Sequence, residues 1–205
     1  CLPPFWMSAI LGLAAIAATF LATRLSLRFH GLVFLFAAAL ASGLLAYAFH
    51  ALAGTMPGRL DASAGIVSLC AFLCYAAGKH LPQESWKSQL LHLATAALAV
   101  FALAALLVEG LLWLSALRMT PSAPYVAFVR TLILCALALA LAYFGSRWHR
   151  VELTRISYAT LGLVAAKLLL EDLRLGHLEF IAAAIFLFAI TLIAVPRFAH
   201  KKKKA

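Results

Sequence analysis

The sequence predicts an all-α polytopic membrane protein with about seven transmembrane helices, its N-terminus outside and its C-terminus in the cytoplasm. Three features predict this fold: a very apolar composition, long apolar runs at short intervals, and basic residues that alternate between the connections. Of the 205 residues, 65% are hydrophobic and 12% are charged, and the mean hydropathy is +1.01. Because soluble domains are about half apolar and a quarter charged, this chain requires lipid as its solvent. Backbone groups in lipid must be hydrogen-bonded internally, and the uninterrupted runs favour helices over barrel strands.

Seven apolar runs approach the roughly 20 residues that a membrane-spanning helix needs. The sixth is apolar from Ile156, and we extend it to residue 152 because Arg155 near a helix end can snorkel to the surface. Prolines lie near the ends of the runs, so no break within a run is expected. The predicted spans are 5–22, 31–54, 62–78, 90–117, 123–145, 152–170 and 178–195. They form one transmembrane domain over 1–205, with a basic cytoplasmic tail at 196–205.

Basic residues divide unequally between the two predicted sides of the membrane. Twelve lie on one side: Arg24, Arg28, Lys79, Lys87, Arg147, Arg150, Arg155, Arg197 and Lys201 to Lys204. Three lie on the other: Arg59, Arg118 and Arg174. Cytoplasmic loops carry the excess of Lys and Arg, so the alternation predicts the orientation and supports the number of spans. It also accounts for the formal net charge of +10 without a nucleic-acid partner.

Glu109 and Arg130 are ionisable residues inside predicted spans, which makes them candidates for function. At a rise of 1.5 Å per residue, Glu109 lies about 13 Å below the outer end of the fourth span, and Arg130 about 9 Å below the same surface on the fifth. An ion pair across this hairpin is therefore expected. The structural interpretation is that the pair holds the hairpin together, and the functional one is that it lines a substrate or proton path.

Lys167, Glu171 and Asp172 form a second charged group, at the outer end of the sixth span, and Glu179 opens the seventh at the same level. Lys167 and Glu171 are four residues apart and share a helix face. Five residues correspond to a rotation of about 140°, so Asp172 is expected to face elsewhere than Lys167. We expect Lys167 and Asp172 to face protein and to dock the sixth span against its neighbours. With Glu109 and Arg130, these residues are the candidate intramembrane polar cluster, read either as a structural network or as a site for a polar headgroup.

Histidines and cysteines are the other residues that can hold a cofactor. His50, His80 and His92 lie near predicted span ends, where an interfacial histidine and a haem or chlorophyll ligand are the alternatives. No pair has metal-motif spacing, so no metal and no cofactor is predicted. Cys70, Cys74 and Cys135 lie within apolar runs and are interpreted as buried, inert thiols. Cys1 is consistent with a processed or lipidated terminus, a fragment, or a true start at Met7.

The segment from Arg155 to Leu173, followed by an apolar span and a basic end, carries Lys167 and then Asp172-Leu173 five residues on. This pattern resembles the C-terminal end of a family of large predicted bacterial polytopic membrane proteins built from many short-looped helices. Members usually open the last span with Arg, where this sequence has Leu178-Glu179. The resemblance covers about 50 residues and implies a bacterial inner-membrane location. It implies no activity, because the family has none assigned.

Three functions remain open at the level of sequence. Short loops, span interiors rich in small residues and the lack of nucleotide-binding, metalloprotease or hydrolase motifs favour a non-catalytic scaffold or accessory subunit of a larger membrane complex. Its partners would be lipids and other membrane subunits. The alternative is a transporter or lipid-handling protein that uses the outer charged cluster. A third interpretation is a pigment- or haem-binding subunit of a photosynthetic or respiratory complex.

The orientation is tested with reporter fusions. A reporter active only in the cytoplasm should work when fused after Lys204 and fail when inserted at Arg118, because positive charge is retained on the cytoplasmic side. Equal activity at both positions would contradict the predicted topology.

Overall fold

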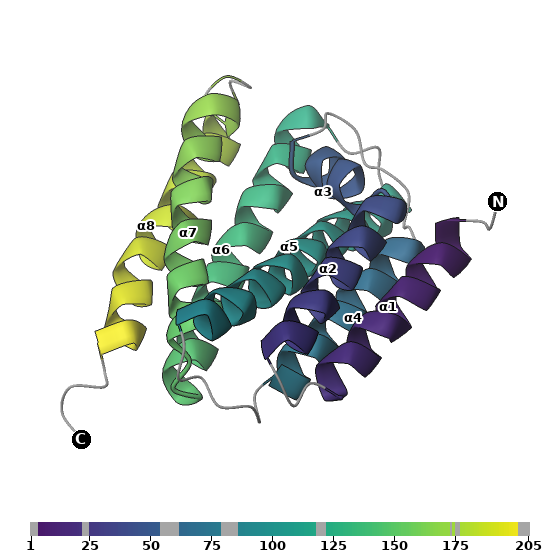
Figure 1. Ribbon diagram of the computed structural model, residues 1–205. Coiled ribbons are helices and arrows are strands. Elements are labelled where there is room, and N and C mark those ends of the chain that lie inside the picture. Colours follow the sequence, from purple (N-terminus) through teal and green to yellow (C-terminus); the bar gives the residue numbers. More distant parts are fainter. Residues whose placement is uncertain are drawn as a thin grey trace. The chain divides into compact units, whose positions relative to one another are not determined.

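In the computed structural model every regular element is a helix (Figure 1). The structure describes residues 4–21, 25–53, 62–78, 86–117, 122–172, 174 and 177–200, and no strand occurs among them. The helices are α1 (Pro4–Phe20), α2 (Leu25–Ala41), α3 (Leu44–Ala53), α4 (Ala62–Gly78), α5 (Trp86–Ala116), α6 (Ala123–Arg147), α7 (Val151–Lys167) with its continuation as a π-helical turn, η1 (Leu168–Asp172), and α8 (Leu178–His200). The all-α prediction is confirmed.

Several of these helices are long and apolar enough to cross a membrane. Four qualify singly, Gln89–Ala116, Ala123–Arg147, Val151–Asp172 and Leu178–Phe198, and α2 with α3 makes a fifth if the two form one bent span. The helices α1 and α4 are apolar but have 17 residues each, about 25 Å against a hydrocarbon core of about 30 Å. The chain is therefore a helical membrane protein, and the number of seven spans stays a prediction.

The expectation of unbroken runs is wrong for the second span. The run predicted over 31–54 divides into α2 and α3, and the two helix axes meet at 65°. Gly43 causes the break, because its φ of +69° lies in the left-handed region that terminates helices. No proline is involved, which is why the proline positions gave no sign of it.

Ser42 satisfies the backbone at this break. The amide of Gly43 donates to the carbonyl of Leu40 at 3.0 Å. The Ser42 hydroxyl donates to the carbonyl of Ala39 at 3.0 Å and accepts from the amide of Leu44 at 3.3 Å. The hydroxyl thus bridges two groups that pair directly in a common glycine-terminated helix end. A bend in an apolar environment therefore leaves these backbone groups hydrogen-bonded.

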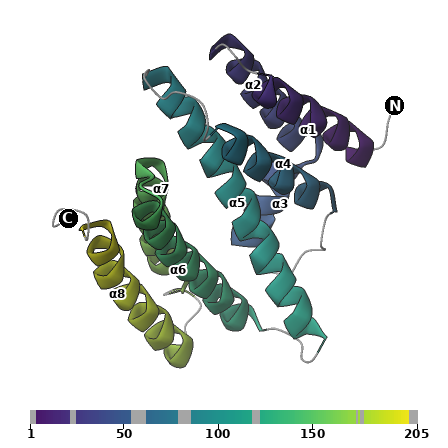
Figure 2. The ribbon, with the colours of Figure 1, turned by 90° about the horizontal axis from the view of Figure 1, so that it is seen from below.

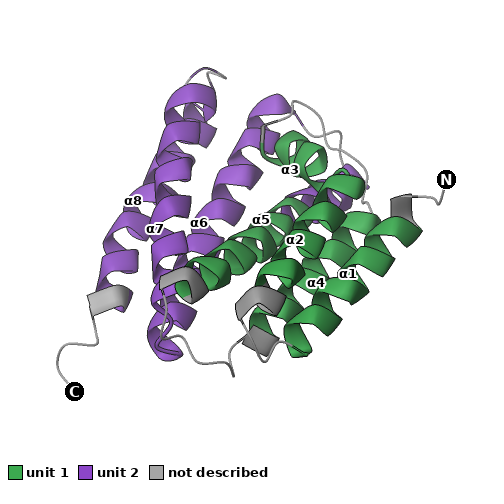
Figure 3. Ribbon diagram, viewed as in Figure 1, with its two compact units in different colours: residues 1–53, 58–106 green, residues 54–57, 107–205 purple. Residues whose placement is uncertain are grey.

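The chain divides into two compact units (Figure 3). Unit 1 comprises 1–53 and 58–106, and unit 2 comprises 54–57 and 107–205, so the long helix α5 contributes to both. The sequence predicts one transmembrane domain over 1–205. The division into two units neither confirms nor contradicts this, so it stays a prediction.

Small residues bring the helices of unit 1 close together. A Cβ atom added at Gly12 of α1 would lie 2.6 Å from the Cys70 sulfur of α4, and one added at Gly31 of α2 would lie 2.8 Å from Thr19 Oγ1 of α1. The buried core around these contacts is rich in alanine: Ala15, Ala38, Ala39, Ala64, Ala71 and Ala102, with Leu35, Leu44, Val67, Cys70 and Cys74. Close approach through small residues is the usual mode of helix packing in lipid.

Replacing Gly43 tests the break. Gly43→Ala should destabilise the protein by about 1–2 kcal/mol, because an L side chain is unfavourable in the left-handed region although no atom lies within 4 Å of the new Cβ. The melting temperature in detergent should fall by about 2–4 °C for each kcal/mol. Gly65→Ala in α4 is the matched control: it also meets nothing within 4 Å, has no left-handed φ, and should be neutral or stabilising. Equal melting temperatures for the two variants would contradict this account.

Candidate functional site: a buried charge network between α6 and α7

Unit 2 packs α7 and α8 against α6, and Figures 1 and 2 show the three helices side by side. Ring contacts between Tyr125 and Phe180 and between Tyr143 and Phe198 join the first and last turns of α6 to those of α8, so these two helices run in the same direction. The chain reverses at residues 148–150, which makes α7 antiparallel to α6. Consequently the end of α7 lies beside the start of α6.

Lys167, the last residue of α7, makes the central contacts of this region. It is only 9% exposed, and its Nζ donates to the carbonyl of Ala127 and to Thr131 Oγ1, both at 3.0 Å on α6. A third bond, of 2.7 Å, reaches Oδ1 of Asp172. An ammonium has three protons, so these three bonds use all of them. The expectation that Lys167 docks the sixth span on a neighbouring helix is confirmed.

Asp172 faces Lys167, contrary to the prediction from regular helix geometry. The chain is π-helical from Leu168 to Asp172, and this wider turn hydrogen-bonds residues five apart. Positions 167 and 172 therefore come to one face, where an α-helix would separate them by about 140°. Asp172 is 5% exposed, and its second oxygen accepts a 2.7 Å hydrogen bond from Thr131 Oγ1.

Glu171 links the pair to Arg130. Its Oε1 accepts from Arg130 Nη1 at 3.0 Å, and its Oε2 lies 3.3 Å from Lys167 Nζ. Arg130 is 1% exposed, whereas the Glu171 side chain is 24% exposed. Two cations and two anions thus form one network, in which the opposite charges balance. Removing one partner from a buried ion pair typically costs about 3–5 kcal/mol, because the remaining charge is left uncompensated.

The structure brings together four of the five residues of the predicted polar cluster: Arg130, Lys167, Glu171 and Asp172. The fifth, Glu109, is 1% exposed on the part of α5 that belongs to unit 2. Its pairing with Arg130 stays a prediction. Glu179, which was expected at the same level, is exposed in the first turn of α8.

Thr131 and the carbonyl of Ala127 were missed by sequence reasoning. The hydroxyl of a threonine inside an apolar helix ordinarily donates a hydrogen bond to the carbonyl four residues earlier. Thr131 Oγ1 also lies 3.2 Å from that carbonyl oxygen, which belongs to Ala127. Its single proton is better placed for Asp172 at 2.7 Å. The adjacency of Thr131 to Arg130 was the only available signal, and it carries little weight without the register of α7 against α6.

The candidate cofactor ligands lie in different settings. His92 is buried in α5, His50 is exposed near the end of α3, and His80 lies outside the described residues. Within the described part of the chain, no group of three or more His, Cys, Asp or Glu side chains is arranged to hold a metal ion. Cys70, Cys74 and Cys135 are buried free thiols, as expected, and Cys1 is outside the described residues.

No protein-family model, curated protein or solved structure matches this chain. The resemblance of its C-terminal part to large bacterial polytopic membrane proteins therefore stays an expectation.

Removing the Lys167 ammonium should destabilise the protein strongly. Lys167→Met leaves Asp172 buried without its cation, and we expect a loss of about 3–5 kcal/mol in unfolding free energy. Asp172→Asn keeps an oxygen for Lys167 and should cost less, about 1–3 kcal/mol. Thermal unfolding in detergent measures both.

Arg155→Met is the matched control, because Arg155 is an exposed cation on the same helix. It should change stability by no more than about 0.5 kcal/mol. If Lys167→Met and Arg155→Met have the same melting temperature, the network does not stabilise unit 2.

Proposed function

We propose that this chain is a non-catalytic integral membrane scaffold or accessory subunit of a larger membrane complex. The observation that carries the proposal is the way the buried Lys167 ammonium donates its hydrogen bonds to α6 and to Asp172. All three protons of Lys167 are used within unit 2, and the two anions balance the two cations. A site built for a charged solute would keep donors or net charge for that solute, so the network is better suited to clamp α7 onto α6.

We further propose seven spans in a bacterial inner membrane, with the N-terminus outside. The helix directions within each unit support this arrangement. In unit 1, Thr19 near the end of α1 lies beside Gly31 near the start of α2, as in an antiparallel hairpin. In unit 2, Arg147 and Arg197 end two helices that run in the same direction. The bent pair α2–α3 then counts as one span, and α1 and α4 as short ones.

The last span offers a surface for a neighbouring subunit. Only 17% of its most apolar window is buried within the chain, against 67% for α6. Phe186 and Ile193 are 66% and 57% exposed on α8. Such a face contacts either lipid or another membrane helix, and both are partners of the proposed scaffold.

A transporter is the second candidate, favoured by the break at Gly43. Discontinuous helices inside a membrane often line the substrate sites of transporters. The π-helical turn η1 is a second irregular element of a type frequent at functional sites.

Assembly distinguishes the two functions. A tagged chain extracted gently from its native membrane should run on native gels as a complex larger than the chain alone. Phe186→Ala with Ile193→Ala should reduce that complex, because both residues lie on the open face of α8, while monomer stability stays unchanged. Leu163→Ala, an exposed apolar residue on α7, is the control. An unaltered complex, together with loss of solute uptake in Lys167→Met at normal protein levels, would favour the transporter.

A further inference from the structure

Two exposed arginines lie at the end of unit 2 where α6 and α8 finish. Arg147 is the last residue of α6, and Arg197 lies in the last turn of α8. Within the described part of the chain neither side chain forms an ion pair or a hydrogen bond. Their guanidiniums therefore keep donors for another molecule, unlike the Lys167 ammonium, which uses its three protons within the unit.

The two arginines flank an aromatic contact between α6 and α8. Gly145 faces α7, because a Cβ atom there would lie 2.7 Å from a side-chain oxygen of that helix. Tyr143 and Arg147 lie two residues before and after Gly145, and a rotation of about 100° per residue turns both to the opposite face of α6. The ring of Tyr143 contacts that of Phe198 on α8, with centroids 6.0 Å apart. Arg197 is the neighbour of Phe198, so one arginine lies on each side of this ring pair.

Aromatic side chains indicate that these arginines lie at the depth of lipid headgroups. Tyr143, Phe144 and Trp148 are exposed at the end of α6, and the rings of Phe144 and Trp148 stack with centroids 4.8 Å apart. Tyrosine and tryptophan are enriched at the interface between hydrocarbon and water. Arg147 lies between Phe144 and Trp148 in the same helical turn, so its guanidinium is at the level of the lipid phosphates.

An apolar strip continues from each arginine along its helix. On α6, Tyr143 and Ala136 lie four and eleven residues before Arg147, and on α8 the side chain of Ile190 lies seven residues before Arg197. The helical repeat puts each set on one face. Tyr143 is 50% exposed, Ile190 is 45% exposed, and Ala136 is exposed as well. Apolar strips that end in cations match a phospholipid, in which an acyl chain leads to a phosphate.

The charge at this end of unit 2 selects an anion. Among the described residues 139–162 and 190–198 the only acidic side chain is that of Glu152, which is 8% exposed. At the opposite end of the unit, the exposed charges of Arg174 and Glu179 balance each other. An anionic headgroup is therefore the electrostatic complement of the end that carries the arginines.

We propose that Arg147 and Arg197 bind the phosphate of an anionic phospholipid, whose acyl chain lies along the strips of α6 and α8 that begin at these arginines. Each guanidinium can donate two parallel hydrogen bonds to phosphate oxygens. In the proposed orientation this end faces the cytoplasm, where anionic lipids attract basic residues near the membrane surface. The proposal requires insertion in a membrane but does not depend on the scaffold role.

The test uses the purified full chain in nanodiscs of phosphatidylcholine that contain a minor fraction of phosphatidylglycerol. Native mass spectrometry after release from the nanodisc counts the lipids that each variant retains. Arg147→Gln with Arg197→Gln removes the two cations of the site. Arg150→Gln with Arg155→Gln is the matched control, because it removes the same charge at the same end of unit 2, from the start of α7.

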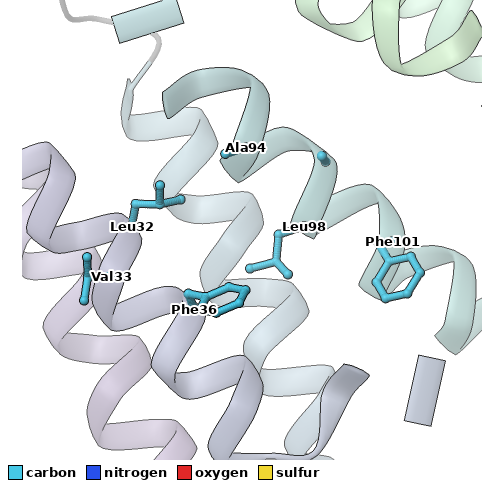
Figure 4. A pocket seen from close by; sticks show the side chains of 7 residues that line it. Leu32, Val33, Phe36, Ala94, Leu98 and Phe101 are labelled. Carbon is cyan, nitrogen blue, oxygen red and sulfur yellow. The ribbon is translucent and has the colours of Figure 1, made fainter. Parts of the chain in front are cut away.

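An apolar groove in unit 1 provides a second control, because it can hold an acyl chain without selecting a headgroup. Figure 4 shows Leu32 and Phe36 of α2 and Leu98 of α5 pointing into this groove, whose volume is about 590 Å³. None of its lining residues has a polar side chain. Ala97→Phe, at a lining residue, narrows the groove and should leave any preference between headgroups unchanged.

The wild type, the Arg150/Arg155 variant and Ala97→Phe should retain phosphatidylglycerol in preference to phosphatidylcholine. The Arg147/Arg197 variant should lower this preference by about fivefold for each cation removed, the effect expected of a basic residue near an anionic surface. Added glycerophosphoglycerol, which is the headgroup without acyl chains, should not displace the lipid.

Three results would overturn the proposal. An equal loss of preference in the Arg147/Arg197 and Arg150/Arg155 variants would mean that the surface attracts anions diffusely and has no site. Displacement of the lipid by glycerophosphoglycerol would mean that the arginines bind a soluble phosphate. No preference for phosphatidylglycerol in the wild type, with a copurifying protein lost from the Arg147/Arg197 variant, would assign the arginines to a protein partner.

Discussion

The burial of the Lys167 ammonium is the constraint on which the arrangement of unit 2 depends. A charge in this environment is tolerated only when each of its protons meets an acceptor. α6 supplies two acceptors, the Ala127 carbonyl and the Thr131 hydroxyl, and Asp172 supplies the third. The α7–α6 register follows from this requirement, because a shift by one residue would carry the ammonium away from both α6 oxygens. The local π-helical turn follows as well, since it is what brings Asp172 onto the face of Lys167.

The requirement that buried polar groups be hydrogen-bonded within the protein also explains the bend at Gly43. Water is absent from the hydrocarbon region, so a helix that bends there must satisfy its freed backbone groups from within the protein. At Gly43 the Ser42 hydroxyl does so by standing between the Ala39 carbonyl and the Leu44 amide. At the bend, the Ser42 side chain therefore replaces the partner that regular helix geometry would have provided. At the π-helical turn, the altered backbone instead brings Asp172 to Lys167.

The two units achieve stability by different means. Unit 1 relies on alanine and glycine, which let apolar helices approach closely and gain dispersion contacts. Unit 2 adds a balanced set of charges, whose bonds are directional and so specify one register. A buried ammonium that donates all three of its hydrogen bonds within the unit is suited to holding helices in place. The exposed apolar face of α8 is instead the surface that suits lipid or protein partners.

The sequence by itself determined the fold class, since composition and run length decide between water and lipid before any contact is made. It also located most helices and singled out Arg130, Lys167, Glu171 and Asp172, because an ionisable residue in an apolar run is conspicuous. It did not show the break at Gly43, since glycine is common within membrane helices and only its backbone conformation distinguishes a break from an ordinary position. It also misjudged the relation of Lys167 to Asp172, because helical periodicity assumes a regular α-helix. Only the tertiary structure decided these points: the acceptors on α6 lie about 40 residues away in sequence, and they make the π-helical register favourable.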